Sequence, residues 1–196
     1  MEETTTLSAS AEMRPKFFKL IKLKIHALAN SRAMLVSIFL YLLSLVALNI
    51  SDSQIQKIAP GISKPDLVFG YTYTDIMDIF RQLGEAGRQA YLINLIVDSI
   101  MPILFAAAVI LVVTRAFPKF WLPLSIAPFL FFILDMIENA AFALMVTQFP
   151  TIDPSLIAFT RPLTMVKLIS FIIAVPSLGV GAIKILIGWI KAKRVA

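Results

Sequence analysis

Four long runs of apolar residues constrain this chain more than any other feature. They cover residues 33–50, 90–114, 121–147 and 163–183, and their only charged side chains are Asp98, Asp135, Glu138 and Lys167. The hydrocarbon core of a bilayer is about 30 Å thick and needs about 20 helical residues to cross it. Strands of a membrane barrel would alternate polar and apolar residues in short segments instead. We therefore predict an all-α, polytopic membrane protein, a bundle of four transmembrane helices.

The composition agrees with this class of protein. Apolar residues make up 59% of the 196 residues and charged residues 15%, and the mean hydropathy is +0.85. A soluble domain carries more charge and less apolar surface, and this length suits one domain. We expect a disordered polar tail over residues 1–13, a basic amphipathic juxtamembrane helix over 14–32, and the membrane domain over 33–196.

The connection between the first two runs, residues 51–89, predicts an outer loop. Its first half is rich in turn-forming residues such as Pro60 and Gly61. In its second half, Ile76, Ile79, Phe80 and Leu83 share one helical face. This predicts a short amphipathic helix on the outer membrane surface, capped by Thr74 and ended by Gly84.

Basic residues near the helix ends predict the orientation. One side of the membrane would hold Arg14, Lys16, Lys19, Lys22, Lys24, Arg32, Arg115, Lys119, Lys184, Lys191, Lys193 and Arg194. The other would hold only Lys57, Lys64, Arg81, Arg88, Arg161 and Lys167. Since the more basic side is normally cytoplasmic, we expect a cell-membrane protein with both termini in the cytoplasm.

Several chemistries are excluded by what the chain lacks. It has no cysteine, and its only histidine, His26, precedes the first run. A thiol nucleophile, a histidine-based zinc site and a Ser-His-Asp triad are therefore not expected, and we predict no metal and no cofactor. The net charge of +6 is explained by the topology and by anionic lipids, which Lys16, Lys19, Lys22 and Lys24 would contact, without any nucleic acid.

Polar side chains recur at helical spacing inside three of the runs. Asp135, Glu138 and Asn139 are at i, i+3 and i+4, so they project from one face of a helix. The second run and the residues just before it carry Arg88, Tyr91, Asn94 and Asp98, and the fourth run carries Lys167. The rise of about 1.5 Å per residue puts most of these groups at a similar depth in the outer half of the membrane.

The cost of burying charge predicts that these groups meet one another. An Asp or Lys at the centre of a membrane helix costs about 2.5–3.5 kcal/mol on insertion scales. We expect Lys167 to pair with Asp98 or Glu138, and all eight side chains to line one polar cavity that opens outward. The alternative is a structural network in which the same groups only hold the helices together.

These motifs resemble a group of uncharacterised four-helix membrane proteins. The pattern is Gly-Arg-x-x-Tyr before the second span, Asp-x-x-Glu-Asn in the third and Lys in the fourth. Here it is carried by Gly87, Arg88 and Tyr91, then Asp135, Glu138 and Asn139, then Lys167. The resemblance covers residues 71–190 and implies the four-helix topology. It implies no activity.

Three functions fit these observations. The first is an intramembrane site that binds or transports a small ligand, a proton or a lipid; transport through only four helices would call for a homo-oligomer. The second is a lipid-modifying enzyme that uses Glu138 and Asp135 in acid–base chemistry. The third is an accessory or scaffold subunit with a structural polar network.

Overall fold

The computed structural model describes residue 20 and residues 22–195 and is 86% helical, with no strand in this part of the chain. Its main helices are α2 (Ser31–Ile58), α3 (Tyr73–Asp98), α4 (Ile100–Ala116), α5 (Trp121–Gln148) and α6 (Pro154–Val195). Within the described residues, four helical stretches are long and apolar enough to cross a membrane: Ser31–Ile58, Tyr73–Ala116, Trp121–Gln148 and Pro154–Arg194. The predicted fold class is confirmed.

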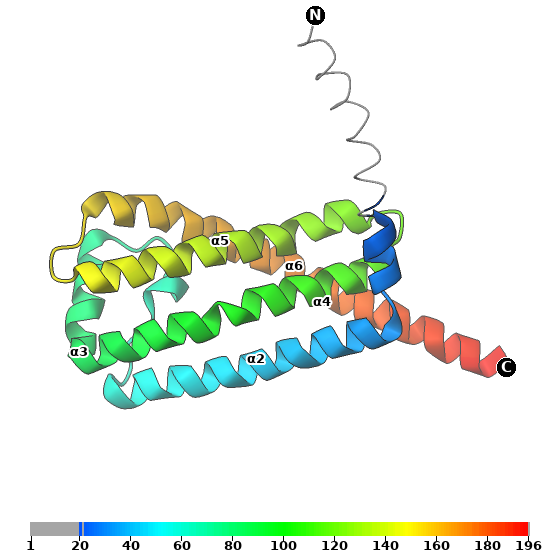
Figure 1. The fold of residues 1–196 in the computed structure, drawn as a ribbon, viewed down its shortest axis with the longest axis horizontal. Coiled ribbons are helices and arrows are strands. Elements are labelled where there is room, and N and C mark those ends of the chain that lie inside the picture. The colour runs from blue at the N-terminus through cyan, green and yellow to red at the C-terminus, as the bar shows by residue number, and fades with distance from the viewer. Residues whose placement is uncertain (1–19, 21, 196) are drawn as a thin grey trace, which may run out of the picture.

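Helix α5 matches its predicted apolar run to within one residue, whereas the other three spanning stretches extend well beyond theirs. Figure 1 shows α2, α4 and α5 running side by side, and α4 contacts α2, α5 and α6. We call the end where α2 stops and α6 starts the η1 end, after the 3-10 helix η1 (Pro65–Leu67) in the α2–α3 loop. The opposite end, where α2 starts and beyond which α6 continues in Figure 1, is the terminal end.

The segment predicted as an outer loop, residues 51–89, is largely helical. Residues 51–58 continue α2, so that Asp52 belongs to that helix. Thr72, and not Thr74, caps α3, because its hydroxyl accepts from the Asp75 backbone N–H while the Asp75 carboxylate accepts from the Thr72 backbone N–H. Gly84 breaks α3, as predicted, with a φ of 62° that favours glycine.

The break at Gly84 divides α3 into two parts with different directions. Figure 1 shows the first part lying across the η1 end of the bundle, while the second part runs along it into α4. The first part contains the buried residues Ile76, Phe80 and Leu83. They join an apolar core at the η1 end that also contains Phe142 and Met145 of α5. A second core, around Phe105 and Phe131, fills the middle of the bundle.

The α2–α3 loop enters this end of the bundle instead of staying outside it. Lys64 and Asp66 are both buried. Backbone N–H groups of Leu67 and Val68 donate to the carbonyls of Lys64 and Pro65, so these four backbone groups are satisfied within the loop. Non-helical backbone is tolerated at membrane depth only where it is enclosed by protein or lines a polar cavity.

The segment predicted as one helix over residues 14–32 is interrupted before α2. Residue 20 and residues 22–28 are helical, and the helix stops at Ala29. Asn30 then caps α2 by accepting a 2.9 Å hydrogen bond from the backbone N–H of Ala33. The predicted tail over residues 1–13, together with Lys16 and Lys19, lies outside the described residues.

Candidate functional site

A buried lysine on α6 joins two carboxylates of α5. The ammonium of Lys167 lies 3.1 Å from the Asp135 carboxylate and forms a second ion pair with Glu138. Asp135 and Glu138 are one turn apart on α5, so a single cation reaches both. The predicted pairing of Lys167 with Glu138 is present, whereas its second pair is with Asp135 and not with Asp98. We call Lys167, Asp135 and Glu138 the Lys167 cluster.

Two hydroxyl groups extend the Lys167 cluster toward the η1 end. The Thr164 hydroxyl donates to Glu138, and the Tyr71 hydroxyl lies 3.2 Å from that of Thr164. Tyr71 belongs to the loop before α3 and is 1% exposed. Burial raises the pKa of Tyr71 to about 12, and the charge of Glu138 acts in the same direction. The phenol therefore stays protonated at neutral pH and can donate a hydrogen bond.

The other buried lysine comes from the loop that enters the bundle. The Lys64 ammonium lies 2.9 Å from Asp52 and 3.7 Å from Asp66, and it donates a 3.1 Å hydrogen bond to the Asn94 amide oxygen. Burial disfavours this ammonium, but the carboxylates of Asp66 and Asp52 outweigh that effect and raise the pKa of Lys64 above its ordinary value. We call Lys64, Asp52 and Asp66 the Lys64 cluster.

Residues of α3 complete the Lys64 cluster. The Tyr91 hydroxyl donates to Asp66 at 3.0 Å, and the Asn94 amide donates to Asp52 at 2.8 Å. Tyr91 and Asn94 are one turn apart on the buried side of α3. This cluster therefore fixes α2, the loop and α3 to one another.

Asp98 lies between the two clusters and has no ion pair with the described residues. It accepts a 3.3 Å hydrogen bond from the amide of Asn139, which also donates to Asp135 at 3.1 Å. Asp98 is 5% exposed, so little water reaches it from the surface. The amide oxygen of Asn139 is buried and accepts no hydrogen bond from the described part of the protein. A carboxylate without a lysine partner and an amide oxygen without a donor therefore lie close together at Asp98 and Asn139.

A cavity of about 230 Å³ lies between the clusters. Its charged lining consists of Asp52, Lys64, Asp66, Asp98, Asp135 and Lys167. Apolar residues that include Met101 and Phe131 form the rest of the wall. Asp52, with a side chain 35% exposed, and Leu67, which is 62% exposed, mark the open side at the η1 end.

The predicted site residues are only partly brought together by the fold. Asp98, Asp135 and Lys167 line the cavity, whereas Tyr91, Asn94, Glu138 and Asn139 form a shell of hydrogen bonds behind them. Arg88 was expected at the rim, and this expectation is wrong. Its guanidinium donates to the Phe80 carbonyl and lies 4.4 Å from the ring centre of Phe149. The break at Gly84 changes the direction of α3 and so brings the Phe80 carbonyl within reach of the Arg88 guanidinium.

Five residues of the site were missing from the sequence-based prediction: Asp52, Lys64, Asp66, Tyr71 and Thr164. All but Thr164 lie in the segment assigned to the outer loop. The one available signal was Lys-Pro-Asp at residues 64–66, two opposite charges around a stiff proline in an otherwise apolar stretch. Thr164 was missed because a threonine in a membrane helix commonly bonds only to its own backbone.

Comparison with known protein families, with curated proteins and with solved structures finds no match for this chain. The resemblance to the uncharacterised four-helix group therefore stays a prediction.

Proposed function

We propose that this membrane protein binds a small, positively charged ligand in the cavity between the Lys64 and Lys167 clusters. The observation that carries the proposal is the balance of charge. The cavity is lined by four carboxylates and two ammonium groups, and Glu138 adds a further carboxylate directly behind Lys167. Each lysine is already shared between two carboxylates. In a medium of low dielectric constant such an excess of negative charge is strongly unfavourable, so a proton or a bound cation must neutralise it.

Asp98 is the group best placed to contact such a ligand. It lines the cavity and, unlike the other carboxylates of the lining, it has no lysine partner among the described residues. The neighbouring Asn139 lies behind the lining and donates its amide to Asp98, so it positions this carboxylate. An ammonium ligand would pair with Asp98, and protons would compete with it for this carboxylate.

The size of the cavity limits the ligand. Pockets for drug-sized molecules are about 300–1,000 Å³, and this cavity holds about 230 Å³. The apolar wall around Met101 and Phe131 suits a ligand with a short hydrocarbon part. The acidic lining and the apolar wall together favour a small organic cation.

The two other functions have weaker support. A lipid-modifying enzyme would need Glu138 to meet its substrate, but Glu138 is fully buried behind Lys167 and does not line the cavity. A purely structural network accounts well for the two lysine clusters, which tie α2, α3, α5 and α6 together. It accounts for the hydrogen bond from Asn139 to Asp98, but this contact between α5 and α3 does not require a charged acceptor.

The proposal is tested by thermal unfolding of the purified protein in lipid nanodiscs. Ammonium, methylammonium, tetramethylammonium and putrescine would each be added at constant ionic strength, with NaCl as the reference. We expect at least one amine to raise the unfolding midpoint of the natural protein, and to do so less as the pH falls. Without amine, the Asp98→Asn variant should unfold at the same midpoint as the natural protein. Added amine should no longer raise that midpoint.

Glu85→Gln is the matched control, because Glu85 is an exposed carboxylate of α3 outside the cavity. Its response to amines should equal that of the natural protein. The proposal fails if no amine shifts the midpoint, or if Asp98→Asn responds as the natural protein does. Loss of stability in Asp98→Asn would favour the structural alternative.

The orientation and the wider contacts belong to the same proposal. Both termini lie in the cytoplasm, and the cavity opens at the outer surface of the cell membrane. Lys16, Lys19, Lys22 and Lys24 contact anionic lipids on the inner surface, and a homo-oligomer is needed only if the ligand is transported. A reporter fused after Ala196 should be cytoplasmic. A reporter found outside the cell would show that the orientation is the opposite one, and the proposed ligand would be unaffected.

A further inference from the structure

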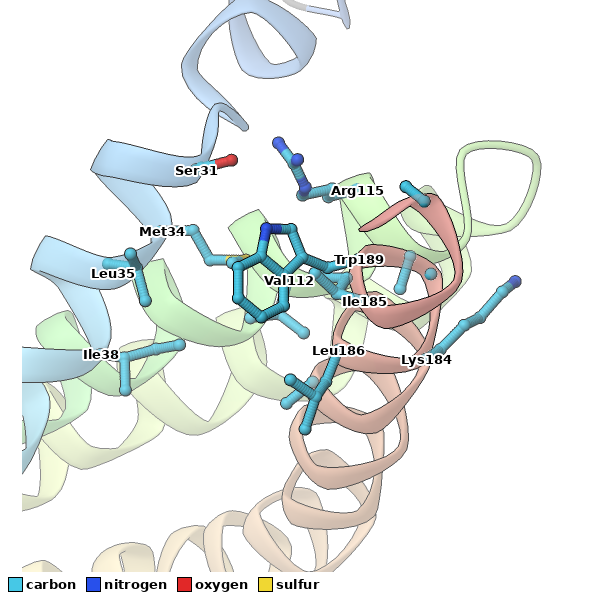
Figure 2. A pocket seen from close by; sticks show the side chains of 14 residues that line it. Ser31, Met34, Leu35, Ile38, Val112, Arg115, Lys184, Ile185, Leu186 and Trp189 are labelled. Carbon is cyan, nitrogen blue, oxygen red and sulfur yellow. The ribbon is translucent and has the colours of Figure 1, made fainter. Parts of the chain in front are cut away.

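A groove far from the polar cavity lies at the terminal end, between α2 and α6. It has a volume of about 770 Å³. Figure 2 shows Met34 and Ile38 of α2 on one side and Ile185, Leu186 and Trp189 of α6 on the other, with Val112 of α4 between them. All these residues belong to segments long and apolar enough to cross a membrane.

The groove results from the way α6 crosses α4. At Gly181 the two helices are so close that an added Cβ would lie 2.5 Å from the Val112 side chain. Figure 1 shows α6 continuing beyond the bundle toward the C-terminus. Past Gly181 the helix therefore no longer packs tightly, and an added Cβ at Gly188 would meet nothing within 4 Å.

The open side of the groove faces the surroundings of the bundle. Leu35, Leu186 and Trp189 line it and are each more than half exposed, at 61%, 54% and 56%. At this level a bilayer surrounds the helices, so the material that reaches these side chains is the acyl chains of lipids. Trp189 suits the boundary between acyl chains and headgroups, where tryptophan is enriched.

One end of the groove carries a positive charge. Figure 2 shows Arg115 and Ser31 together at this end, opposite Ile38 and Leu186. Arg115 is in the last turn of α4 and Ser31 is the first residue of α2, so both lie at the edge of the membrane spans. The guanidinium uses one N–H in a 3.3 Å hydrogen bond to the Ala29 carbonyl. It has five N–H donors, and the others remain for a phosphate.

We infer that the groove binds one anionic glycerophospholipid. An acyl chain lies along Met34, Ile38 and Leu186, and the phosphodiester is held by Arg115 with the Ser31 hydroxyl beside it. The apolar groove matches the acyl chain of such a lipid, and the guanidinium at its end matches the negatively charged headgroup. The Lys184 ammonium lies 4.3 Å from the ring centre of Phe117 and takes no part.

Native mass spectrometry of the full-length protein tests this site. The protein would be titrated with dioleoyl phosphatidylglycerol and, separately, with dioleoyl phosphatidylcholine. We expect the first phosphatidylglycerol to bind about tenfold more tightly than phosphatidylcholine, because only the former has a net negative charge for Arg115. Arg115→Gln should remove this preference by weakening phosphatidylglycerol about tenfold.

Two further variants separate the groove from a general attraction to charge. Lys119→Gln removes a positive charge from the exposed α4–α5 loop at the same end, and should leave the tight binding within about twofold of the natural protein. Gly188→Leu fills the groove where there is open space, so the protein should fold and lose the tight lipid.

The inference is overturned if the two lipids bind equally, if Arg115→Gln keeps the preference, or if Gly188→Leu binds as the natural protein does. A dimer that excludes the lipid and is broken by Gly188→Leu would also overturn it, since a second copy would then occupy the groove. None of these outcomes depends on Asp98 or on the polar cavity.

Discussion

Lys167 of α6 and Asp135 of α5 face each other at 3.1 Å, and their side chains are only 4% and 3% exposed. Such a buried ion pair matters for stability, because each charged partner would be strongly unfavourable at this depth without the other. Glu138 shares the same ammonium, so the cation compensates two carboxylates at once.

Replacing Lys167 by Met should therefore lower the free energy of unfolding by about 3–5 kcal/mol, since two carboxylates lose their cation. Chemical unfolding in detergent, followed by circular dichroism, measures this. Lys184→Met, at an exposed position of the same helix, is the control and should stay near the natural value. If Lys167→Met is as stable as this control, the ion pairs do not hold α5 and α6 together.

A triple variant should restore much of that loss. Combining Lys167→Met with Asp135→Asn and Glu138→Gln removes the uncompensated charges while it keeps the volumes similar. We expect it to be more stable than Lys167→Met alone under the same unfolding conditions. A triple variant less stable than the single one would mean that the packing of these side chains, and not their charge, dominates.

The capping box of α3 involves Thr72 but not the nearby Thr74, so replacing the two residues should have different effects on stability. Thr72→Ala should reduce stability by about 0.5–2 kcal/mol, because the hydroxyl no longer accepts from the Asp75 N–H. Thr74→Ala, at an exposed position just inside the helix, should change it by less than about 0.5 kcal/mol. Both are measured by the same unfolding titration, and equal effects would contradict the cap assignment.

Tyr71 should make stability depend on pH in the alkaline range. Its pKa is about 12 in the folded protein and about 10 in an unfolded chain. Between these values the unfolded state loses the phenolic proton first, so the contribution of Tyr71 is complete below pH 10 and falls as the pH rises toward 12. Unfolding midpoints measured from pH 9 to 12 should show this decline.

Tyr71→Phe isolates this effect from the titration of lysines. At pH 9 the variant should be less stable by about 0.5–1.5 kcal/mol, since the bond to Thr164 is lost. The difference between the two proteins should shrink above pH 10 and reverse its sign by about pH 12, because a pKa difference of about 2 corresponds to about 2.7 kcal/mol, more than this hydrogen bond contributes. A difference that stays constant over this range would show that the phenol does not titrate as described.

Two glycines of α6 should respond to alanine in opposite ways. Gly181→Ala places a methyl group against Val112 and should destabilise the protein by about 1–3 kcal/mol. Gly179→Ala meets no neighbour within 4 Å and should be neutral or stabilising by up to about 1 kcal/mol. Unfolding of both variants checks this, and Val112→Ala combined with Gly181→Ala should recover part of the loss.

The sequence was sufficient for those features that depend on a single helix. The apolar runs predicted the spans, and the spacing of Asp135, Glu138 and Asn139 predicted their common buried face, because both follow from the helical repeat. The entry of Lys64 and Asp66 into the bundle could not be predicted in this way. Charged residues beside a proline ordinarily indicate a loop in water, and only the partners on α2 and α3 make their burial favourable.

The same limit explains the position of Arg88 and the groove at the terminal end. The direction of Arg88 depends on the break at Gly84, which the sequence indicates, but also on the angle between the two parts of α3, which it does not. The groove depends on how α6 crosses α4 at Gly181. Crossing angles result from side-chain packing between helices and are not encoded in the periodicity of either one.

The ion pairs between α5 and α6 also have a consequence for how the protein is made. Asp135 and Glu138 leave the ribosome before Lys167 does, so α5 carries two carboxylates toward the translocon without their counter-charge. Each would cost about 2.5–3.5 kcal/mol at the centre of a lone helix. Only the short segment from Phe149 to Asp153 separates α5 from α6. The two helices can therefore enter the lipid together, as one hairpin whose charges are already matched.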